Sequence, residues 1–82
     1  MSTTMFFEQE LYPANDEGRA DVNKPSTELE LFRTSFYGDD QIFLRVETPD
    51  GQRNILHLTK KQAQELAESL NSVVSYIGYD NR

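Results

Sequence analysis

Apolar and polar residues alternate in a pattern that predicts three β-strands followed by one helix. Residues 28–37, ELELFRTSFY, are rich in aromatic and β-favouring side chains, which is typical of a strand. Residues 41–47 alternate strictly, and residues 52–58, QRNILHL, form the next strand. From Lys60 to about Tyr76, apolar residues recur at spacings of three and four, as on one stripe of a helix. We therefore expect an α+β fold, β-β-β-α, in which a three-stranded antiparallel meander carries one C-terminal amphipathic helix packed on one face.

The segment TPDG at residues 48–51 sets the register of the second hairpin. Pro49 suits the first central position of a type I turn, and Gly51 is free to take positive φ. A three-residue loop then pairs Glu47 with Arg53, which brings opposite charges together. In this register one face carries the apolar side chains Ile42, Leu44, Val46, Leu56 and Leu58, and we expect the helix to cover it. The other face carries Phe43, Arg45, Arg53, Ile55 and His57.

The sequence marks the start of the helix clearly, but it marks the register of the first hairpin poorly. Thr59 and Gln62 fit a capping box, and Gly78 is a natural stop after the helix. For the first hairpin, with GDD as its turn, pairing Phe36 with Ile42 would bring Phe32 and Phe36 into the core. That register also sets Arg33 opposite Arg45, which is unfavourable because the charges are alike.

The first 27 residues differ from the rest in charge and pattern. The net charge is −6, and residues 1–30 hold seven acids against two bases, so most of the excess lies there. We divide the chain into an acidic N-terminal segment, 1–27, that is partly flexible, and a single domain, 28–82. Within the first segment MFFEQELY could be a short strand, one turn of helix or a docking peptide. Residues 13–27 are polar and rich in proline, which is typical of a loop or linker.

Composition excludes several kinds of site. The chain has no cysteine and one histidine, His57, so neither thiolate chemistry nor a zinc site is expected. No phosphate-binding glycine loop or calcium loop is present, and we expect no catalytic residue, no metal and no cofactor. No apolar run approaches the roughly 20 residues that span a bilayer. We expect a cytoplasmic protein without a membrane partner.

The motif YGDD at residues 37–40 occurs in viral RNA-copying polymerases, where the two aspartates hold metal ions. Those enzymes need several hundred residues for their template and nucleotide sites, whereas this chain has 82. Glycine and aspartate are also common in any turn. We therefore interpret the motif as a polar β-turn.

The sheet face away from the helix is the predicted binding surface. Arginine, aromatic and aliphatic side chains together are typical of interfaces. Its candidate residues are Arg33, Phe43, Arg45, Arg53, Ile55 and His57. We expect a non-enzymatic interaction module (an adaptor, inhibitor or assembly subunit), similar in size and charge to phage or plasmid accessory proteins. The N-terminal segment could instead fold over this face, with Glu8 and Glu10 meeting the arginines.

Two alternatives remain open. Three strands followed by a helix is also the order in some sheet-reading DNA-binding domains, where Arg33, Arg45 and Arg53 would enter the major groove. The net charge of −6 opposes that function. The second alternative is a structural homodimer formed through the sheet face or the strand edges.

Overall fold

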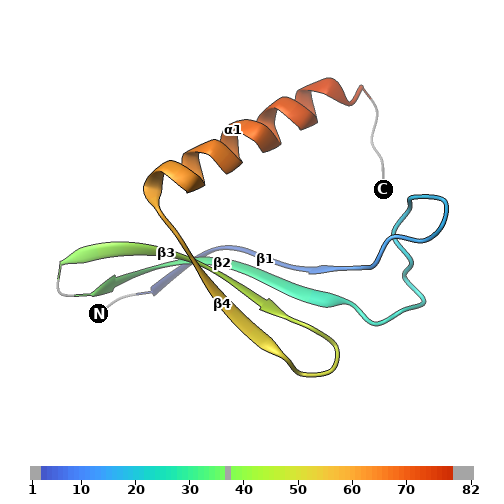
Figure 1. Ribbon diagram of the computed structural model, residues 1–82, viewed down its shortest axis with the longest axis horizontal. Helices are drawn as coiled ribbons and strands as arrows, with labels where there is room; N and C mark the ends of the chain where they lie inside the picture. Colours follow the sequence, from blue (N-terminus) through green and yellow to red (C-terminus); the bar gives the residue numbers. More distant parts are fainter. Residues whose placement is uncertain (1–2, 37, 79–82) are drawn as a thin grey trace.

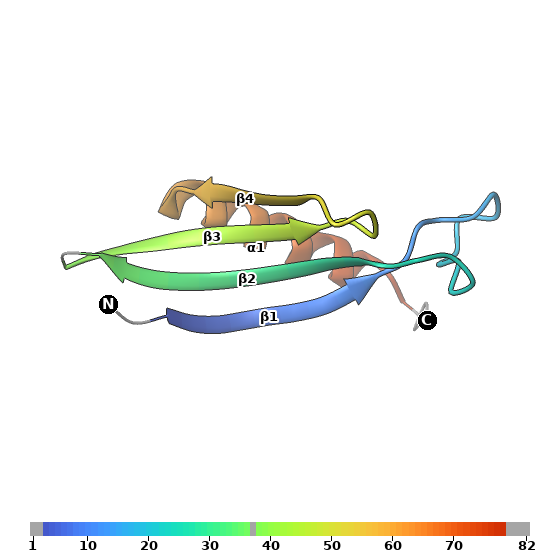
Figure 2. The same ribbon diagram turned by 90° about the horizontal axis from the view of Figure 1, so that it is seen from below.

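The described part of the chain folds into four strands and one helix (Figure 1). The computed structural model describes residues 3–36 and 38–78. The elements are β1 (Thr3–Leu11), β2 (Thr27–Phe36), β3 (Asp39–Glu47), β4 (Arg53–Leu58) and α1 (Lys60–Tyr76). All strand pairs are antiparallel, and the sheet order β1-β2-β3-β4 follows the sequence (Figure 2). The expected α+β class is confirmed, but the sheet has four strands where the sequence predicted three.

The additional strand is β1, which pairs with β2 along its length. The register shifts between Met5 and Phe7, so Phe6 is a bulge residue. Phe7 lies opposite Leu31, and Phe6 also lines the cleft between the sheet and α1. Phe6 and Phe7, although adjacent in sequence, can therefore both lie on the same side of the sheet. The bulge hides the alternation that would otherwise mark a strand, which is why the sequence left its structure open.

The β3–β4 hairpin has the predicted register, with Glu47 opposite Arg53 and Leu44 opposite Leu56. The loop is the expected three-residue turn. The Thr48 amide donates to the Gln52 carbonyl at 2.9 Å, and the Gly51 amide donates to the Thr48 carbonyl at 3.0 Å. Gly51 has a φ of 88°, in the left-handed region that favours glycine. The hairpin thus fixes which side chains of β3 and β4 share a face.

The register of the first hairpin differs from the prediction. Phe36 pairs with Asp39 and not with Ile42, so the connection is two residues long and contains Gly38 at a φ of 87°. The predicted turn segment GDD is therefore mostly strand, and Tyr37, the predicted end of the first strand, lies outside the described residues. The shift of three residues reverses the facing of β2. Phe32 lies opposite Phe43, outside the expected core, because this register sets Glu30 and not Arg33 opposite Arg45.

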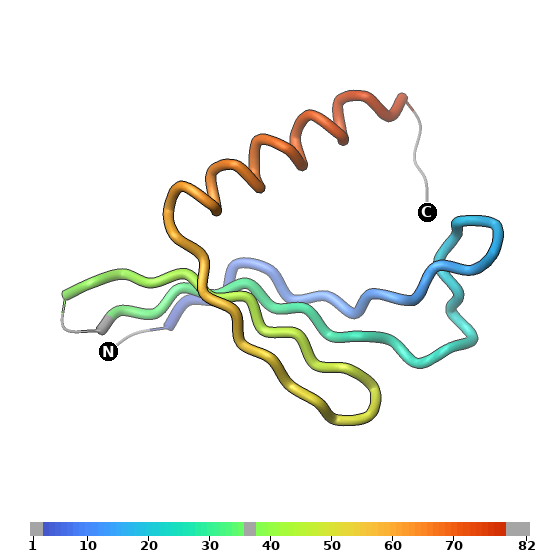
Figure 3. Tube along the Cα trace, viewed as in Figure 1, coloured from blue at the N-terminus to red at the C-terminus, as the bar shows by residue number. Residues whose placement is uncertain are grey.

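The helix has the predicted bounds but a different position. The Thr59 hydroxyl accepts from the Gln62 amide, and the Gln62 side chain accepts from the Thr59 amide, both at 3.0 Å. The expected capping box is therefore confirmed, and α1 ends at Tyr76. However, α1 diverges from the sheet as it leaves β4 and does not lie flat on it (Figures 1 and 3). The helix therefore does not pack closely over the apolar face as expected, and no apolar side chain is buried among residues 3–35 and 38–78.

The connection from β1 to β2 is held by its own hydrogen bonds. The Asn15 side chain accepts from the amides of Glu17 and Arg19 at 2.9 and 3.0 Å, and Ala14 pairs with Ala20. No helix among residues 3–36 and 38–78 combines the length and apolar character needed to cross a membrane.

Candidate interaction surfaces

The sheet has two chemically different faces. We call the face turned away from α1 the outer face, and the face turned toward α1 the inner face. The register aligns three rows of outer-face residues across β2, β3 and β4. These rows are Phe32–Phe43–His57, Glu30–Arg45–Ile55 and Glu28–Glu47–Arg53. The outer face is therefore aromatic at one end and charged at the other.

Arg45 is the centre of the charged end. Its Nε donates to Glu30 Oε2 at 3.1 Å, and its Nη2 donates to the other Glu30 oxygen, so the pair is bidentate. Nη2 also donates to Glu28 Oε1 at 2.5 Å, and Nη1 donates to Glu47 Oε1 at 2.8 Å. The Arg45 side chain is only 17% exposed and Glu30 only 11%. A guanidinium that is satisfied by three carboxylates is a structural group of the sheet and is not free for a ligand.

The same contacts shift the pKa values of the three carboxyls in different directions. Hydrogen bonds from Arg45 lower the pKa of Glu30, with a smaller contribution from Glu28. Hydrogen bonds from Arg53 and then Arg45 lower the pKa of Glu47. The hydrogen bond between Glu28 and Glu30, together with desolvation, raises the pKa of Glu28. Glu28 is thus the carboxyl of this group that takes up a proton most readily.

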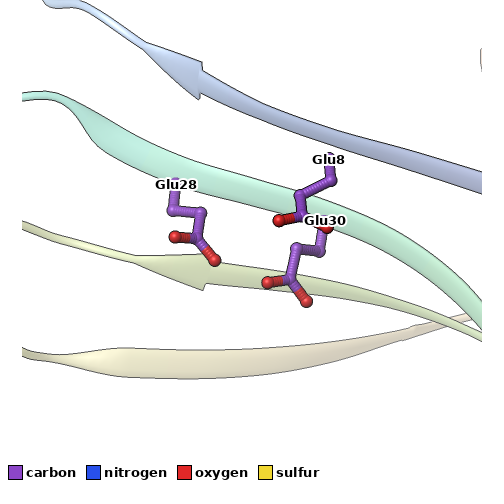
Figure 4. A group of neighbouring side chains, drawn as sticks. All are labelled: Glu8, Glu28 and Glu30. Carbon is purple, nitrogen blue, oxygen red and sulfur yellow. The ribbon is translucent and has the colours of Figure 1, made fainter. Parts of the chain in front are cut away.

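Glu8 on β1 adds a further carboxyl beside Glu28 and Glu30. Oxygen atoms of the three residues lie within 4.8 Å of one another, and Figure 4 shows Glu8 next to Glu30 with Glu28 further along β2. Such a group could ligate a divalent cation by spacing alone. Here the Arg45 guanidinium already binds Glu28 and Glu30, so it supplies the positive charge that these oxygens require. That no metal is bound here stays a prediction, which the pairing of Glu28 and Glu30 with Arg45 favours.

The aromatic end of the outer face is continuous over three strands. Phe32 and Phe43 stack with their ring centroids 5.6 Å apart, and His57 meets Phe43 edge-on at 5.5 Å. His57 Nε2 lies 2.7 Å from Gln41 Oε1, which fixes the orientation of the imidazole ring. Next to this row, Ile55 on β4 is 57% exposed.

Five of the six predicted site residues lie on the outer face: Phe43, Arg45, Arg53, Ile55 and His57. Arg33 does not, because the observed register turns it to the inner face. There its Nη1 donates to Asp40 Oδ1 at 2.8 Å and its Nη2 donates to Thr4 Oγ1 at 3.3 Å. The expectation that Arg33 shares a face with Arg45 and Arg53 is wrong, since the observed register pairs Phe36 with Asp39 instead of Ile42 and so sets Arg33 opposite Ile42.

Sequence reasoning missed the carboxylates that surround Arg45. Glu28 and Glu30 are two residues apart, and strand periodicity places both on one face. That spacing was a usable signal, because Arg45 needs an acidic partner on a neighbouring strand. Choosing the register by charge pairing would have identified Glu30 as that partner.

The YGDD motif does not build a metal site. Asp39 and Asp40 are the first two residues of β3, so their side chains point to opposite faces of the sheet. Asp40 is paired with Arg33 on the inner face. Two carboxylates arranged in this way cannot hold the same pair of ions. Tyr37 of the motif lies outside the described residues.

The inner face borders an apolar cleft of about 330 Å³ between the sheet and α1. The residues that line it from the sheet are Phe6, Leu31, Phe32, Arg33, Ile42, Leu44 and Leu58, and those from the helix are Ala63, Leu66, Ala67 and Leu70. The helix stripe is nonetheless largely open to solvent. Leu66 is 43% exposed, Leu70 56% and Val73 58%. The inner face and the stripe are therefore two apolar surfaces that their own chain leaves uncovered.

Comparison with protein-family models, curated proteins and solved structures finds no significant match to this chain. Its function must therefore be argued from the two faces themselves.

Proposed function

We propose that the protein is a small non-enzymatic interaction module, an adaptor, inhibitor or assembly subunit, that binds a protein partner through the outer face. The observation that carries the proposal is the exposed strip Arg53, Ile55 and His57 on β4, backed by the stacked Phe43. Aromatic and aliphatic groups beside an arginine are typical of the centre of a protein interface. Arg45 supports this strip from within the sheet, as a positioning residue.

The charge of the outer face favours a basic partner. Six carboxylates share this face with the guanidiniums of Arg45 and Arg53: those of Glu8, Glu10, Glu28, Glu30, Asp39 and Glu47. The carboxylates outnumber the guanidiniums by four, and four of the six carboxylates lie on β1 and β2. A partner with lysine or arginine side chains over β1 and β2, and an apolar group over Ile55, would match both ends of the face.

The DNA-binding alternative has less support. Arg33 lies on the inner face, Arg45 is bound by three carboxylates and Arg53 is paired with Glu47 at 3.0 Å. A phosphate backbone approaching the outer face would meet an excess of negative charge.

The test is a comparison of partners captured by three forms of the immobilised full-length chain from a lysate of its natural host. The forms are the wild type, an outer-face variant with Arg53→Ala, Ile55→Ala and His57→Ala, and a helix control with Gln64→Ala and Ser72→Ala. All five side chains are exposed, so both variants should keep the fold. Captured proteins are identified by mass spectrometry after nuclease treatment.

We expect a basic protein that the wild type and the helix control retain, that the outer-face variant loses, and whose retention falls with salt. Equal retention by all three forms, or no retained protein, would refute the proposed surface.

A further inference from the structure

The described chain has two apolar surfaces and no apolar core. Among residues 3–35 and 38–78 the buried side chains are Glu30 and Thr34, and both belong to the sheet. A domain of this size depends on burying its apolar side chains, because the net stability of a small core is only a few kcal/mol. The described residues therefore do not supply the apolar cover that the inner face and the helix stripe require.

The exposed area has the size of a stable dimer interface. The accessible surface of the chain is 6982 Å². A compact monomer of 9.5 kDa is expected to expose about 5,000 Å², so the excess is about 1,900 Å². Permanent homodimers bury roughly 1,000 to 2,500 Å² from each partner. The excess is thus enough for an obligate interface.

The charges of the inner surfaces permit two copies to meet there. On the inner face of β2, β3 and β4 the charged residues are Arg33 and Asp40, which neutralise each other at 2.8 Å. The helix stripe contains no charged residue; its members are Ala63, Leu66, Ala67, Leu70, Val73, Val74 and Ile77. Two chains that each carry a charge of −6 would repel through their acidic outer faces, but not through these surfaces.

The two surfaces also match each other in length and chemistry. The 17 residues of α1 extend about 25 Å, and the nine residues of β3 extend about 30 Å. One residue, Thr59, separates β4 from α1, and the capping box fixes it. Beyond this connection α1 diverges from its own sheet (Figure 1), and its stripe stays largely exposed and available to another chain.

We propose that the inner face is completed by a second copy of this chain, in a two-fold dimer where the α1 stripe of each copy packs on the inner face of the other. The arrangement is self-complementary, since each chain supplies one sheet and one helix and both are covered in one step. It leaves both outer faces on the outside of the dimer. The dimer does not depend on the proposed partner, and the proposed partner does not depend on the dimer.

Sedimentation equilibrium of the full-length chain tests the proposal. We expect twice the 9.5 kDa mass of one chain. Leu66→Glu with Leu70→Glu should weaken the dimer on the order of 100-fold or more, because four unpaired carboxylates would be buried. The matched control, Gln64→Glu with Ser72→Glu, adds the same charge on the opposite side of α1 and should stay dimeric. The outer-face variant with Arg53→Ala, Ile55→Ala and His57→Ala should also stay dimeric.

A wild-type mass of one chain at all concentrations would overturn the proposal. So would a dimer that is lost in the outer-face variant but kept in the helix-stripe variant, which carries Leu66→Glu and Leu70→Glu. Circular dichroism of the helix-stripe variant separates dissociation from unfolding, and either result with a dimeric control supports the proposal. If the wild type is a monomer and captures a partner that the outer-face variant fails to capture, the dimer is rejected and the proposed function stands.

Discussion

At the scale of single residues, Arg45 is the residue that links the charged side chains of the sheet. It joins β2 and β3 through Glu30 and joins neighbouring positions of β3 through Glu47. Glu28 completes the group but competes with Glu30, since two carboxylates cannot both be charged there without repulsion. The opposite pKa directions of Glu28 and Glu30 therefore make opposite predictions for stability.

We expect Glu30→Gln to lower the melting temperature at neutral pH and Glu28→Gln to raise it. The folded pKa of Glu30 lies below its ordinary 4.5, so its contribution is present above pH 4.5 and is lost as the pH falls through the folded value. The folded pKa of Glu28 lies above 4.5, so its contribution is present below pH 4.5 and is lost as the pH rises through the folded value. Glutamine keeps the neutral form of Glu28 at every pH.

Thermal unfolding at one protein concentration, at neutral pH and below pH 4.5, measures both effects. On acidification, the melting temperature of the Glu30→Gln variant should also fall less than that of the wild type. If the melting temperatures of both variants shift equally and in the same direction, then Glu28 and Glu30 do not have the opposite effects on stability that we describe.

At the scale of elements, the sequence predicted correctly those elements whose turn, alternation or cap is fully visible in the sequence. The PDG turn and the alternation in 41–47 fixed the β3–β4 hairpin, and the Thr59–Gln62 box fixed the start of α1. They therefore also placed five outer-face residues correctly: Phe43, Arg45, Arg53, Ile55 and His57. The strand β1 was left open because the bulge at Phe6 breaks its alternation. The β2 register was wrong because a two-residue turn replaced a longer one, and this turned Arg33 to the inner face.

The capping box is the element-scale feature with the clearest energetic consequence. We expect Thr59→Ala to reduce the free energy of unfolding by about 1 kcal/mol, because the Gln62 amide loses its acceptor. Ser69→Ala is the matched control, since it removes an exposed hydroxyl within α1 without touching a cap. Urea unfolding compares the two variants. A loss in the control as large as in Thr59→Ala would contradict the role assigned to the cap.

At the scale of the whole molecule, the chain is too open to be complete alone. Its radius of gyration is 15.2 Å, whereas a compact domain of 82 residues has about 11.7 Å. Part of this openness is visible in α1, which diverges from the sheet (Figure 3), and the apolar stripe of α1 is largely exposed. The sequence pattern predicted the stripe but not its separation from the sheet, because periodicity tells which side of a helix is apolar and not which chain covers it.

The most direct measurement is an isotope-filtered nuclear Overhauser experiment on an equal mixture of carbon-13-labelled and unlabelled chains. The filter selects contacts between two different copies. We predict cross-peaks between the methyl groups of Leu66 or Leu70 in one copy and those of Leu31 or Leu44 in the other, since these residues carry the stripe and the inner face. Contacts between these groups only within one chain, or no contact between copies, would contradict the account.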